Sequence, residues 1–514
     1  MLSRVFGFLR YRTLTAYFTK EQLDLFFAAF RIPDIVFEIL ITGALTTSFI
    51  PFFVKYDKNK ELQSTTISSV INIIVLVLFS LILLLVIFLD HVMPFLASGA
   101  RFSQSDIRTV TLYSQLLLLG QLPFLVFGNF LTGISQARKM FLLPAIAPII
   151  YNLAIILSTF ALASQYYLLA PVIGVISGAI IFFLIQLPVL AISDFKYRLV
   201  IKPSRALFDF FKVAIPRIFT IVVSQIDATV DFTLITNLAS GSLTVFYLAQ
   251  NLQLLPVSVI GVAFGQASLP YLTEMYQNDN KEEFKKVIVD SILNLFFLVI
   301  PITSFFMFAR TPLVRLAFGS EKFDWQGTNL TALTLSYFAI ALPFHSIYYF
   351  LTRCFYAIFD SKTPFYISVF SVLMNAALSI YFIIFLKMPV WSLGISFSIS
   401  MITSVIILLV VLYVRLKGYN ISTLLIETIK MIFATFVASY AANHVKDLLD
   451  GLIFDTTRTI NVFLLIVTVL SIHFLLYLLL SWVFNVREMY LLSKMIFKVK
   501  EYRKRITELY TGTQ

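Results

Sequence analysis

Charged side chains inside long apolar stretches are the residues of this sequence that could carry function. Arg4 and Arg10 fall in the first apolar stretch, and Asp24 and Arg31 fall in the second. A charge at the centre of a bilayer costs about 2.5–3.5 kcal/mol on insertion scales, so a charge that remains there usually faces a polar cavity or a partner. We therefore predict that these four residues line a polar cavity.

The second stretch orders its charges with helical spacing. Asp24, Arg31 and Glu38 are seven residues apart, which places them on one stripe of a helix. Pro33 stands between them, and a proline inside a helix bends it and frees a backbone carbonyl. The second helix is therefore predicted to be bent where its charges lie.

A later stretch carries Asp227 and Asp231, one helical turn apart. Two interpretations of all these charges stay open. They line a cavity bordered by the first, second and seventh helices, or they pair with one another and hold the helices together. Arg4 and Arg12 lie near a helix end and could also snorkel to the membrane surface.

Motifs for enzymatic chemistry are missing from the sequence. The single cysteine, Cys354, lies in an apolar run, and the four histidines are scattered without metal-ligand spacing. There is no phosphate-binding glycine loop, zinc signature or nucleophile elbow. We predict a protein that is not an enzyme and that holds no catalytic residue, structural metal or nucleic acid. We also expect no cleavable signal peptide.

The elements that position the charges are membrane spans. Of 514 residues, 59% are hydrophobic and 13% charged, which is too apolar for a soluble core. Apolar runs of about 20 residues predict an all-α polytopic membrane protein with about fourteen spans. Gly261 and Gly265, near Pro256 and Pro270, are expected to let the eighth span bend and pack closely. The predicted spans are 1–19, 23–54, 66–96, 108–135, 141–163, 167–193, 213–239, 243–274, 287–309, 329–358, 364–386, 390–414, 424–443 and 459–486.

Basic residues predict the orientation. Most Lys and Arg residues outside the spans lie in loops on the same side as the termini, so both termini are predicted to be cytoplasmic. The predicted divisions are a first lobe of six helices (1–194), a cytoplasmic linker (195–212), a second lobe of six helices (213–418), helices 13 and 14 (419–486) and a basic cytoplasmic tail (487–514). Residues 488–508 are predicted to form a basic helix on the membrane surface, in contact with anionic lipids.

The chain also repeats itself at an offset of about 220 residues. Leu131-Thr132 falls on Leu351-Thr352, Asn152 on Asn375, and Gly174 near Gly394. Because six spans separate the copies, the two lobes form a parallel repeat with a substrate site between them. At this offset the first helix is shorter than its copy by about two turns.

Several ordered motifs resemble the MurJ (MviN) family of lipid II flippases, within the multidrug/oligosaccharidyl-lipid/polysaccharide exporter superfamily. Residues 3–10 (SRVFGFLR), 24–33 (DLFFAAFRIP) and 43–51 (GALTTSFIP) are similar to its opening helices. Residues 238–242 and 255–270 are similar to its seventh and eighth. The resemblance implies a flippase in the bacterial inner membrane, which moves lipid II to the outer leaflet by alternating access.

The resemblance also implies a ligand set. Arg4, Arg10 and Asp24 stand at family positions with required charges in a cationic cavity, which would bind the head group of a polyprenyl-pyrophosphate-linked glycopeptide. Asp231 and Asn375 would match ligands of a sodium ion; no other cofactor is expected.

The chain departs from the family where neutral Tyr11, Phe37, Thr42 and Asn251 replace charged residues, and Ser379 replaces an acid of the sodium site. Two alternatives therefore stay open. One is a flippase or exporter of another lipid-linked oligosaccharide or of a drug. The other is a non-transporting scaffold that docks cell-wall synthesis proteins.

Overall fold

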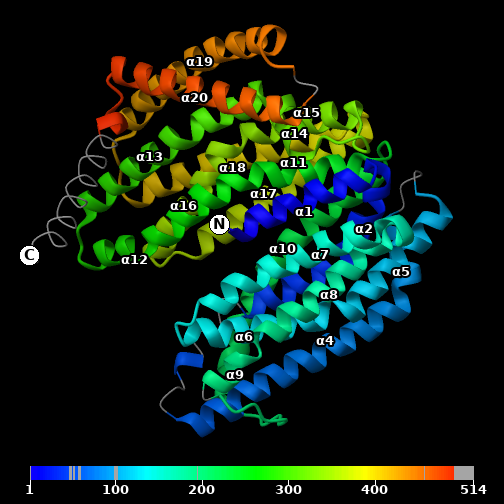
Figure 1. Ribbon diagram of the computed structural model, residues 1–514. Helices are drawn as coiled ribbons and strands as arrows, with labels where there is room; N and C mark the ends of the chain where they lie inside the picture. The colour runs from blue at the N-terminus through cyan, green and yellow to red at the C-terminus, as the bar shows by residue number, and fades with distance from the viewer. Residues whose placement is uncertain are drawn as a thin grey trace, which may run out of the picture. The chain divides into compact units, whose positions relative to one another are not determined.

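A computed structural model describes residues 2–45, 49, 53–55, 59–97, 102–193, 195–455 and 458–490 (Figure 1). These residues form helices joined by short turns, with no strand among them. The chain divides into two compact units. The first unit comprises Met1–Leu248, Ala317–Leu330 and Ala376–Val390, and the second comprises Ala249–Leu316, Thr331–Asn375 and Trp391–Gln514.

The all-helical membrane fold is confirmed, and the expected count of fourteen spans is approximate. Within the described residues, eleven helices are long and apolar enough to cross a membrane, or twelve if one bent pair counts as a single span. That pair is α15 (Trp325–Ile340) and α16 (Leu342–Ala357), which meet at 43°. The first two expected spans are helical but are not among the twelve. They are α1 (Leu2–Tyr17), which has only 16 residues, and α2 (Lys20–Phe37), which continues into the π-helix η1 (Glu38–Leu45) and carries several charges.

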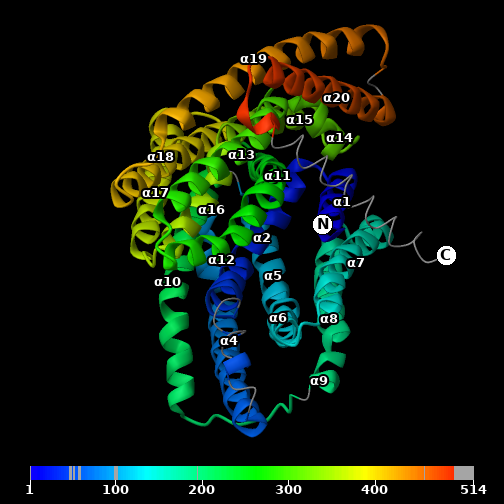
Figure 2. The ribbon, with the colours of Figure 1, turned by 90° about the vertical axis from the view of Figure 1, so that its left-hand side faces the viewer.

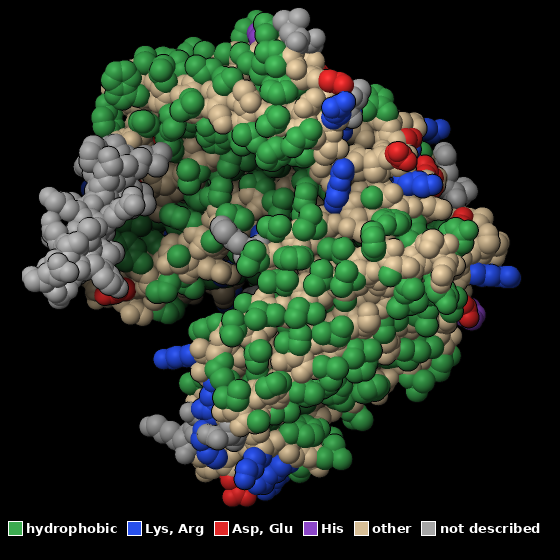
Figure 3. Space-filling view, in the orientation of Figure 1, with side chains coloured by type: hydrophobic (Ala, Val, Ile, Leu, Met, Phe, Trp, Pro, Cys, Tyr) green, Lys and Arg blue, Asp and Glu red, His purple; other side chains and the backbone are tan. Residues whose placement is uncertain are grey.

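The first unit contains most of the N-terminal helices. After η1 they are α4 (Lys60–Leu96), α5 (Gln104–Gly120), α6 (Leu122–Ala137), α7 (Leu142–Tyr166), α8 (Leu169–Gln186), α9 (Pro188–Ile192) and α10 (Arg205–Thr236). On α4, Leu78 is fully buried while Leu76 and Leu83 are 60% and 64% exposed. Figure 3 shows hydrophobic side chains over the visible face of this unit, with Lys and Arg gathered at the end where α4 begins and α9 lies. Buried and exposed leucines on one helix are expected where that helix packs against protein on one face and against lipid on the other. Basic residues at one end are expected where the helices reach the membrane surface.

Small residues set the closest packing in the first unit. A Cβ on Gly174 of α8 would lie 2.7 Å from the Cα of Ile155 on α7, and one on Gly178 would lie 2.9 Å from the carbonyl oxygen of Tyr151. Small residues let helix backbones approach where lipid gives no hydrophobic drive for association. This approach fixes the part of α7 that carries Tyr151.

The second unit contains most of the C-terminal helices. They are η2 (Val257–Val262), α12 (Ala263–Gln277), α13 (Lys281–Phe308), α14 (Arg310–Phe318), α16, α17 (Lys362–Ile380), α18 (Trp391–Arg415), α19 (Ile421–Leu452) and α20 (Thr459–Val483), preceded by α11 (Ser242–Pro256), which begins in the first unit. In Figure 2, α19 and α20 run side by side. The close packing predicted at Gly261 and Gly265 is confirmed, because added Cβ atoms there would lie 2.6 and 3.0 Å from the backbone of α16.

A proline explains how α20 attaches to α13. Pro301 lacks an N–H, so the carbonyl of Phe297, four residues earlier, has no helical partner. The hydroxyl of Tyr477 on α20 donates to this oxygen at 3.0 Å. His473, one turn earlier, lies with Nε2 3.1 Å from the carbonyl oxygen of Pro301. The freed carbonyl is thus satisfied by a neighbouring helix, as helices in lipid require.

Some predictions stay untested by this fold. The division into lobes at residues 194, 212, 418 and 486 remains a prediction. The surface helix expected at 488–508 lies mostly outside the described residues, which end at 490.

Candidate functional site

The start of α2 and the hydrogen bonding around Pro33 are both determined by neighbouring side chains. Thr19 caps the helix, since its side chain accepts from the N–H of Gln22 and its own N–H donates to Gln22 Oε1 at 3.0 Å. Pro33 removes the hydrogen bond to the Ala29 carbonyl, and the Ser114 hydroxyl of α5 donates to that oxygen at 2.8 Å. The helix then widens into η1 at Glu38. The α-helix continues through Pro33 to Phe37, and the bend expected at Pro33 stays a prediction. The π-helical turns that follow are of a kind that is frequent at functional sites.

A cavity of about 410 Å³ lies in the first unit beside this part of α2. Most of its wall is apolar or aromatic, while seven polar side chains come from α1, α2, α6, α7, α11 and the residue between α5 and α6. The polar side chains are Arg10, Tyr11, Asp34, Gln121, Asn129, Tyr151 and Tyr247. A mainly apolar pocket with a few converging polar groups is the usual form of a small-ligand site.

Arg10 and Asp34 are the charged residues among those that line the cavity. The Arg10 guanidinium lies 4.6 Å from the ring centroid of Tyr11, a cation–π contact that orients it. Asp34 is exposed within the cavity and interacts electrostatically with Arg31 and Arg10. Tyr151 is positioned by Gln121, whose Nε2 donates to its hydroxyl at 3.2 Å. The lining thus offers one cation, one anion and several neutral hydrogen-bonding groups, where the resemblance implied a cationic cavity.

The four predicted substrate residues lie in different environments. Arg10 lines the cavity, whereas Arg4, on the same helix, is exposed and does not line it. Asp24 and Arg31 are each 5% exposed and lie on α2 away from the cavity lining. Sequence reasoning missed Asp34, although an acid directly after Pro33 in an apolar stretch is as costly as the charges that it selected.

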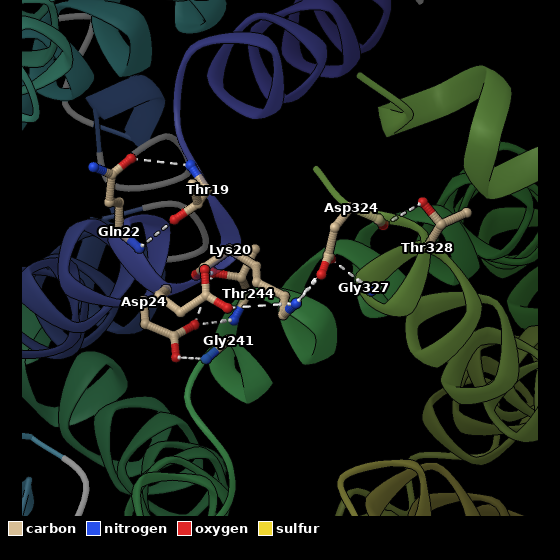
Figure 4. A network of polar contacts seen from close by, with 10 residues as sticks. Thr19, Lys20, Gln22, Asp24, Gly241, Thr244, Asp324, Gly327 and Thr328 are labelled. Carbon is tan, nitrogen blue, oxygen red and sulfur yellow. Dashed lines mark hydrogen bonds and ion pairs between the residues drawn. The ribbon is translucent and has the colours of Figure 1, made fainter. Parts of the chain in front are cut away.

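Within the described part of the chain, Asp24 binds backbone groups and a hydroxyl, and no arginine is among its partners. One carboxylate oxygen accepts the N–H of Gly241 at 2.6 Å, and the other accepts the N–H and the hydroxyl of Thr244 at 2.7 and 2.8 Å (Figure 4). Gly241 has φ +88°, and a Cβ there would lie 2.6 Å from Cγ of Lys20, so glycine is required. The carboxylate therefore stabilises the first N–H groups of α11, where a negative charge is favourable.

Lys20 extends this contact to the segment before α15. Its Nζ lies 2.6 Å from Oδ2 of Asp324, whose Oδ1 also accepts the N–H of Gly327 at 2.8 Å. Although burial raises the pKa of the Asp324 carboxyl, the hydrogen bond from Lys20 and the one from Gly327 outweigh burial, and the pKa lies below its usual value. We call Lys20, Asp24, Gly241, Thr244 and Asp324 together the Asp24 clasp.

Arg31 attaches the middle of α2 to α10. Its Nη2 donates to the carbonyl oxygen of Gln225 at 2.8 Å and to the Thr229 hydroxyl at 2.6 Å. Asp24 and Arg31 hold helices together through backbone groups and neutral side chains, whereas the pairing interpretation expected contacts between the charges themselves. Arg10 lines a cavity, as the other interpretation expected. Asp231 lies on α10 in the first unit and Asn375 on α17 in the second, and the sodium site stays a prediction.

Broken helices, a charged cavity and eleven or twelve apolar spans together define a multi-span membrane transporter. The model of the family "Lipid II flippase MurJ" matches residues 15–463, and the chain belongs to this family.

Relatives and solved structures agree with this assignment. The chain is 27% identical to the probable lipid II flippase MurJ of Borreliella burgdorferi, over 84% of this chain and 85% of that protein. It is 28% identical to the lipid II flippase MurJ of Burkholderia cenocepacia, over 74% of this chain and 75% of that one. A solved lipid II flippase MurJ in an inward closed conformation superposes with a TM-score of 0.77 at 25% identity, covering 94% and 96% of the two chains. An inward-facing multidrug transporter of the MATE family shares the fold, with a TM-score of 0.70 at 14% identity and coverage of 81% and 94%.

Proposed function

We propose that the protein moves lipid II from the inner to the outer leaflet by alternating access. The observation that carries the proposal is Arg10, a guanidinium open to a polar cavity in a chain of the MurJ family. A lipid-linked pyrophosphate cannot cross hydrocarbon unaided, because unpaired charge there is very costly. A guanidinium stabilises such an anion through two parallel hydrogen bonds.

The neutral groups of the cavity suit the rest of such a head group. Gln121, Asn129 and the hydroxyls of Tyr151 and Tyr247 can pair with sugar hydroxyls and peptide amides. The energy need not come from a nucleotide. With the cytoplasm negative, moving an anion outward releases about 2.3 kcal/mol per charge per 100 mV.

Rescue of a bacterial strain depleted of its own lipid II flippase tests the proposal. The parent chain should restore growth, and Arg10→Ala should not, although it accumulates normally in the membrane. Arg10→Lys should restore growth in part, since a point charge replaces a two-pronged donor. Arg4→Ala is the matched control, because Arg4 lies on the same helix outside the cavity lining.

Two outcomes would overturn this reasoning at different levels. A parent chain that accumulates but does not rescue would remove lipid II as the cargo. Rescue by Arg10→Ala at normal abundance would keep the cargo and remove the proposed role of the cavity cation.

Asp34 favours a second candidate, a transporter of another cargo in the same superfamily. An acid beside Arg10 gives the lining no net charge among its described residues, which suits a zwitterionic or neutral cargo as well as an anionic one. Failed rescue by the parent chain, together with binding of a zwitterionic lipid-linked oligosaccharide that is weakened by Asp34→Asn, would support this candidate.

We further propose that the chain lies in the bacterial cytoplasmic membrane with both termini in the cytoplasm, because basic residues predominate in the loops on the side of the termini. Reporter fusions after Lys60 and after Lys202 should be cytoplasmic, and a fusion near Lys322 should be external. If the fusion after Lys202 is external, the proposed orientation is wrong.

A further inference from the structure

A second polar cavity, of about 490 Å³, lies in the second unit at the ends of three helices. It is lined by the first turns of α13, by the turn that leads into α19, and by Arg487, four residues after the end of α20. All three helices are apolar spans, so this end of each lies where the membrane meets water. The cavity belongs to a different unit from the one that holds Arg10.

Three basic side chains line this cavity, and their ion pairs leave capacity for an added anion. Lys285 lies 2.7 Å from Glu282, and Arg487 lies 2.6 Å from Asp290. Lys286 has no ion-pair partner within the described part of the chain. A lysine has three donors and an arginine five, so one acidic partner satisfies neither Lys285 nor Arg487. These donors leave capacity for contacts with a phosphate group that break no existing pair.

The position of Arg487 is fixed by its own backbone. Its N–H donates to Oε2 of Glu427 at 3.2 Å, and Oε1 of Glu427 lies 2.7 Å from Nζ of Lys430. Glu427 is 8% exposed and lies on α19, so it joins the residue after α20 to the neighbouring helix. The guanidinium is held at the cavity by this contact and by Asp290, which reduces the entropy lost when a ligand binds.

The helices that end at the cavity have apolar outer faces. On α19, Leu425 and Ile429 are 56% and 64% exposed, on the side of the helix away from Thr423, which lines the cavity. The cavity therefore lies at the level of lipid head groups, and the acyl chains of a lipid bound there would enter the adjoining hydrocarbon. Basic pockets between spans at the membrane surface are known as sites for anionic lipid head groups.

We propose that this cavity binds the phosphate of an anionic phospholipid, with Lys285, Lys286 and Arg487 as its ligands and the acyl chains in the adjoining hydrocarbon. The first backbone N–H groups of α19 add a favourable partial positive charge at the same end. The site is distinct from the cargo cavity, and it does not depend on what the protein transports.

Lipid binding by the purified full-length protein tests the proposal. Detergent-solubilised protein is titrated with phosphatidylglycerol, with phosphatidylcholine or with inorganic phosphate. Native mass spectrometry counts the bound lipid, and thermal unfolding gives the apparent affinity. The variant carries Lys285→Gln and Lys286→Gln together. The control carries Lys281→Gln and Lys362→Gln, an equal loss of charge at exposed lysines that do not line the cavity.

Phosphatidylglycerol should bind at saturation, more tightly than phosphatidylcholine, whose choline cation competes with the lysines for its phosphate. The double variant should bind phosphatidylglycerol about thirty-fold more weakly, since each basic residue near an anionic lipid contributes roughly a factor of five. The control should bind like the parent. If the double variant does not fold, Lys286→Gln alone should weaken binding about five-fold.

Equal affinity of the variant and the control would overturn the proposal, and so would equal binding of the two phospholipids. If inorganic phosphate stabilises the parent but not the variant, and the phospholipids stabilise neither, the site binds a free anion. That result would also overturn the proposal of a lipid site.

Discussion

Replacement of Asp24 by asparagine is the sharpest test of how α2 is held. The aspartate accepts two backbone N–H groups and one hydroxyl, and its side chain is buried. Asparagine keeps one acceptor oxygen and places an NH2 group where the other oxygen was. Either the Gly241 N–H or the Thr244 N–H then faces another donor, and a buried donor left unsatisfied costs about 1–3 kcal/mol.

The hydrogen bonding that remains is also weaker, because bonds to a charged carboxylate are about twice as strong as bonds between neutral groups. We therefore expect Asp24→Asn to lower the free energy of unfolding by about 2–3 kcal/mol, and Asp24→Ala to lower it further. Glu21→Gln is the matched control. Glu21 lies on the same turn with a side chain 46% exposed, and its contact with Lys20 at 3.4 Å is a surface pair of about 1 kcal/mol at most.

Thermal unfolding in detergent measures these effects, and a double-mutant cycle assigns them. Thr244→Val keeps the Thr244 N–H but removes the hydroxyl, which lies 2.8 Å from both Asp24 Oδ1 and the carbonyl oxygen of Lys20 and can donate to either. Its cost should shrink by about 1 kcal/mol in the Asp24→Asn background, because the two changes remove a shared bond. If Asp24→Asn unfolds like the parent, or if the costs of the two changes are strictly additive, the hydrogen bonds of the Asp24 clasp do not stabilise the fold. Asp24 would then act through a different partner.

The other contacts of α2 give further predictions. Arg31→Lys should lower the free energy of unfolding by about 1–2 kcal/mol, since an ammonium on a shorter stem cannot reach both the Gln225 carbonyl and the Thr229 hydroxyl; an unchanged melting curve would contradict this. The ion pair of Lys20 and Asp324 should stabilise the protein above the usual aspartate pKa. This contribution should be lost as the pH falls through the lowered pKa of Asp324. Melting curves at a series of acid pH values check it, and Asp324→Asn should flatten the dependence there.

Local features of this fold could be predicted from the sequence, because their causes lie within a few residues. The limits of the helices follow from apolar runs and from caps such as Thr19. The free carbonyl of Ala29 follows from the missing N–H of Pro33. The burial of Asp24 and Arg31 follows from their place in an apolar stretch. None of these inferences requires knowledge of what lies across the helix interface.

The partners could not be predicted, because they depend on contacts between distant parts of the chain. Asp24 meets Gly241 and Thr244, which are 217 and 220 residues away. An offset of about 220 residues also relates the two copies of the internal repeat, yet a repeat predicts equivalent positions and does not predict contact. The seven-residue spacing selected Glu38 and not Asp34, because Asp34 does not lie on that stripe of the helix. Asp34 nevertheless lines the cavity.

The three uses of charge on α2 follow from what each side chain can reach. Asp24 lies in the second turn, where the first N–H groups of another helix are available to a carboxylate. Arg31 lies where α10 offers a carbonyl and a hydroxyl, which suit a guanidinium with several donors. Asp34 comes directly after the proline and lines the cavity. Because the first two charges bind groups of neighbouring helices, they hold α2 in place. Arg10 and Asp34 both line the cavity, so a cargo bound there would lie against both.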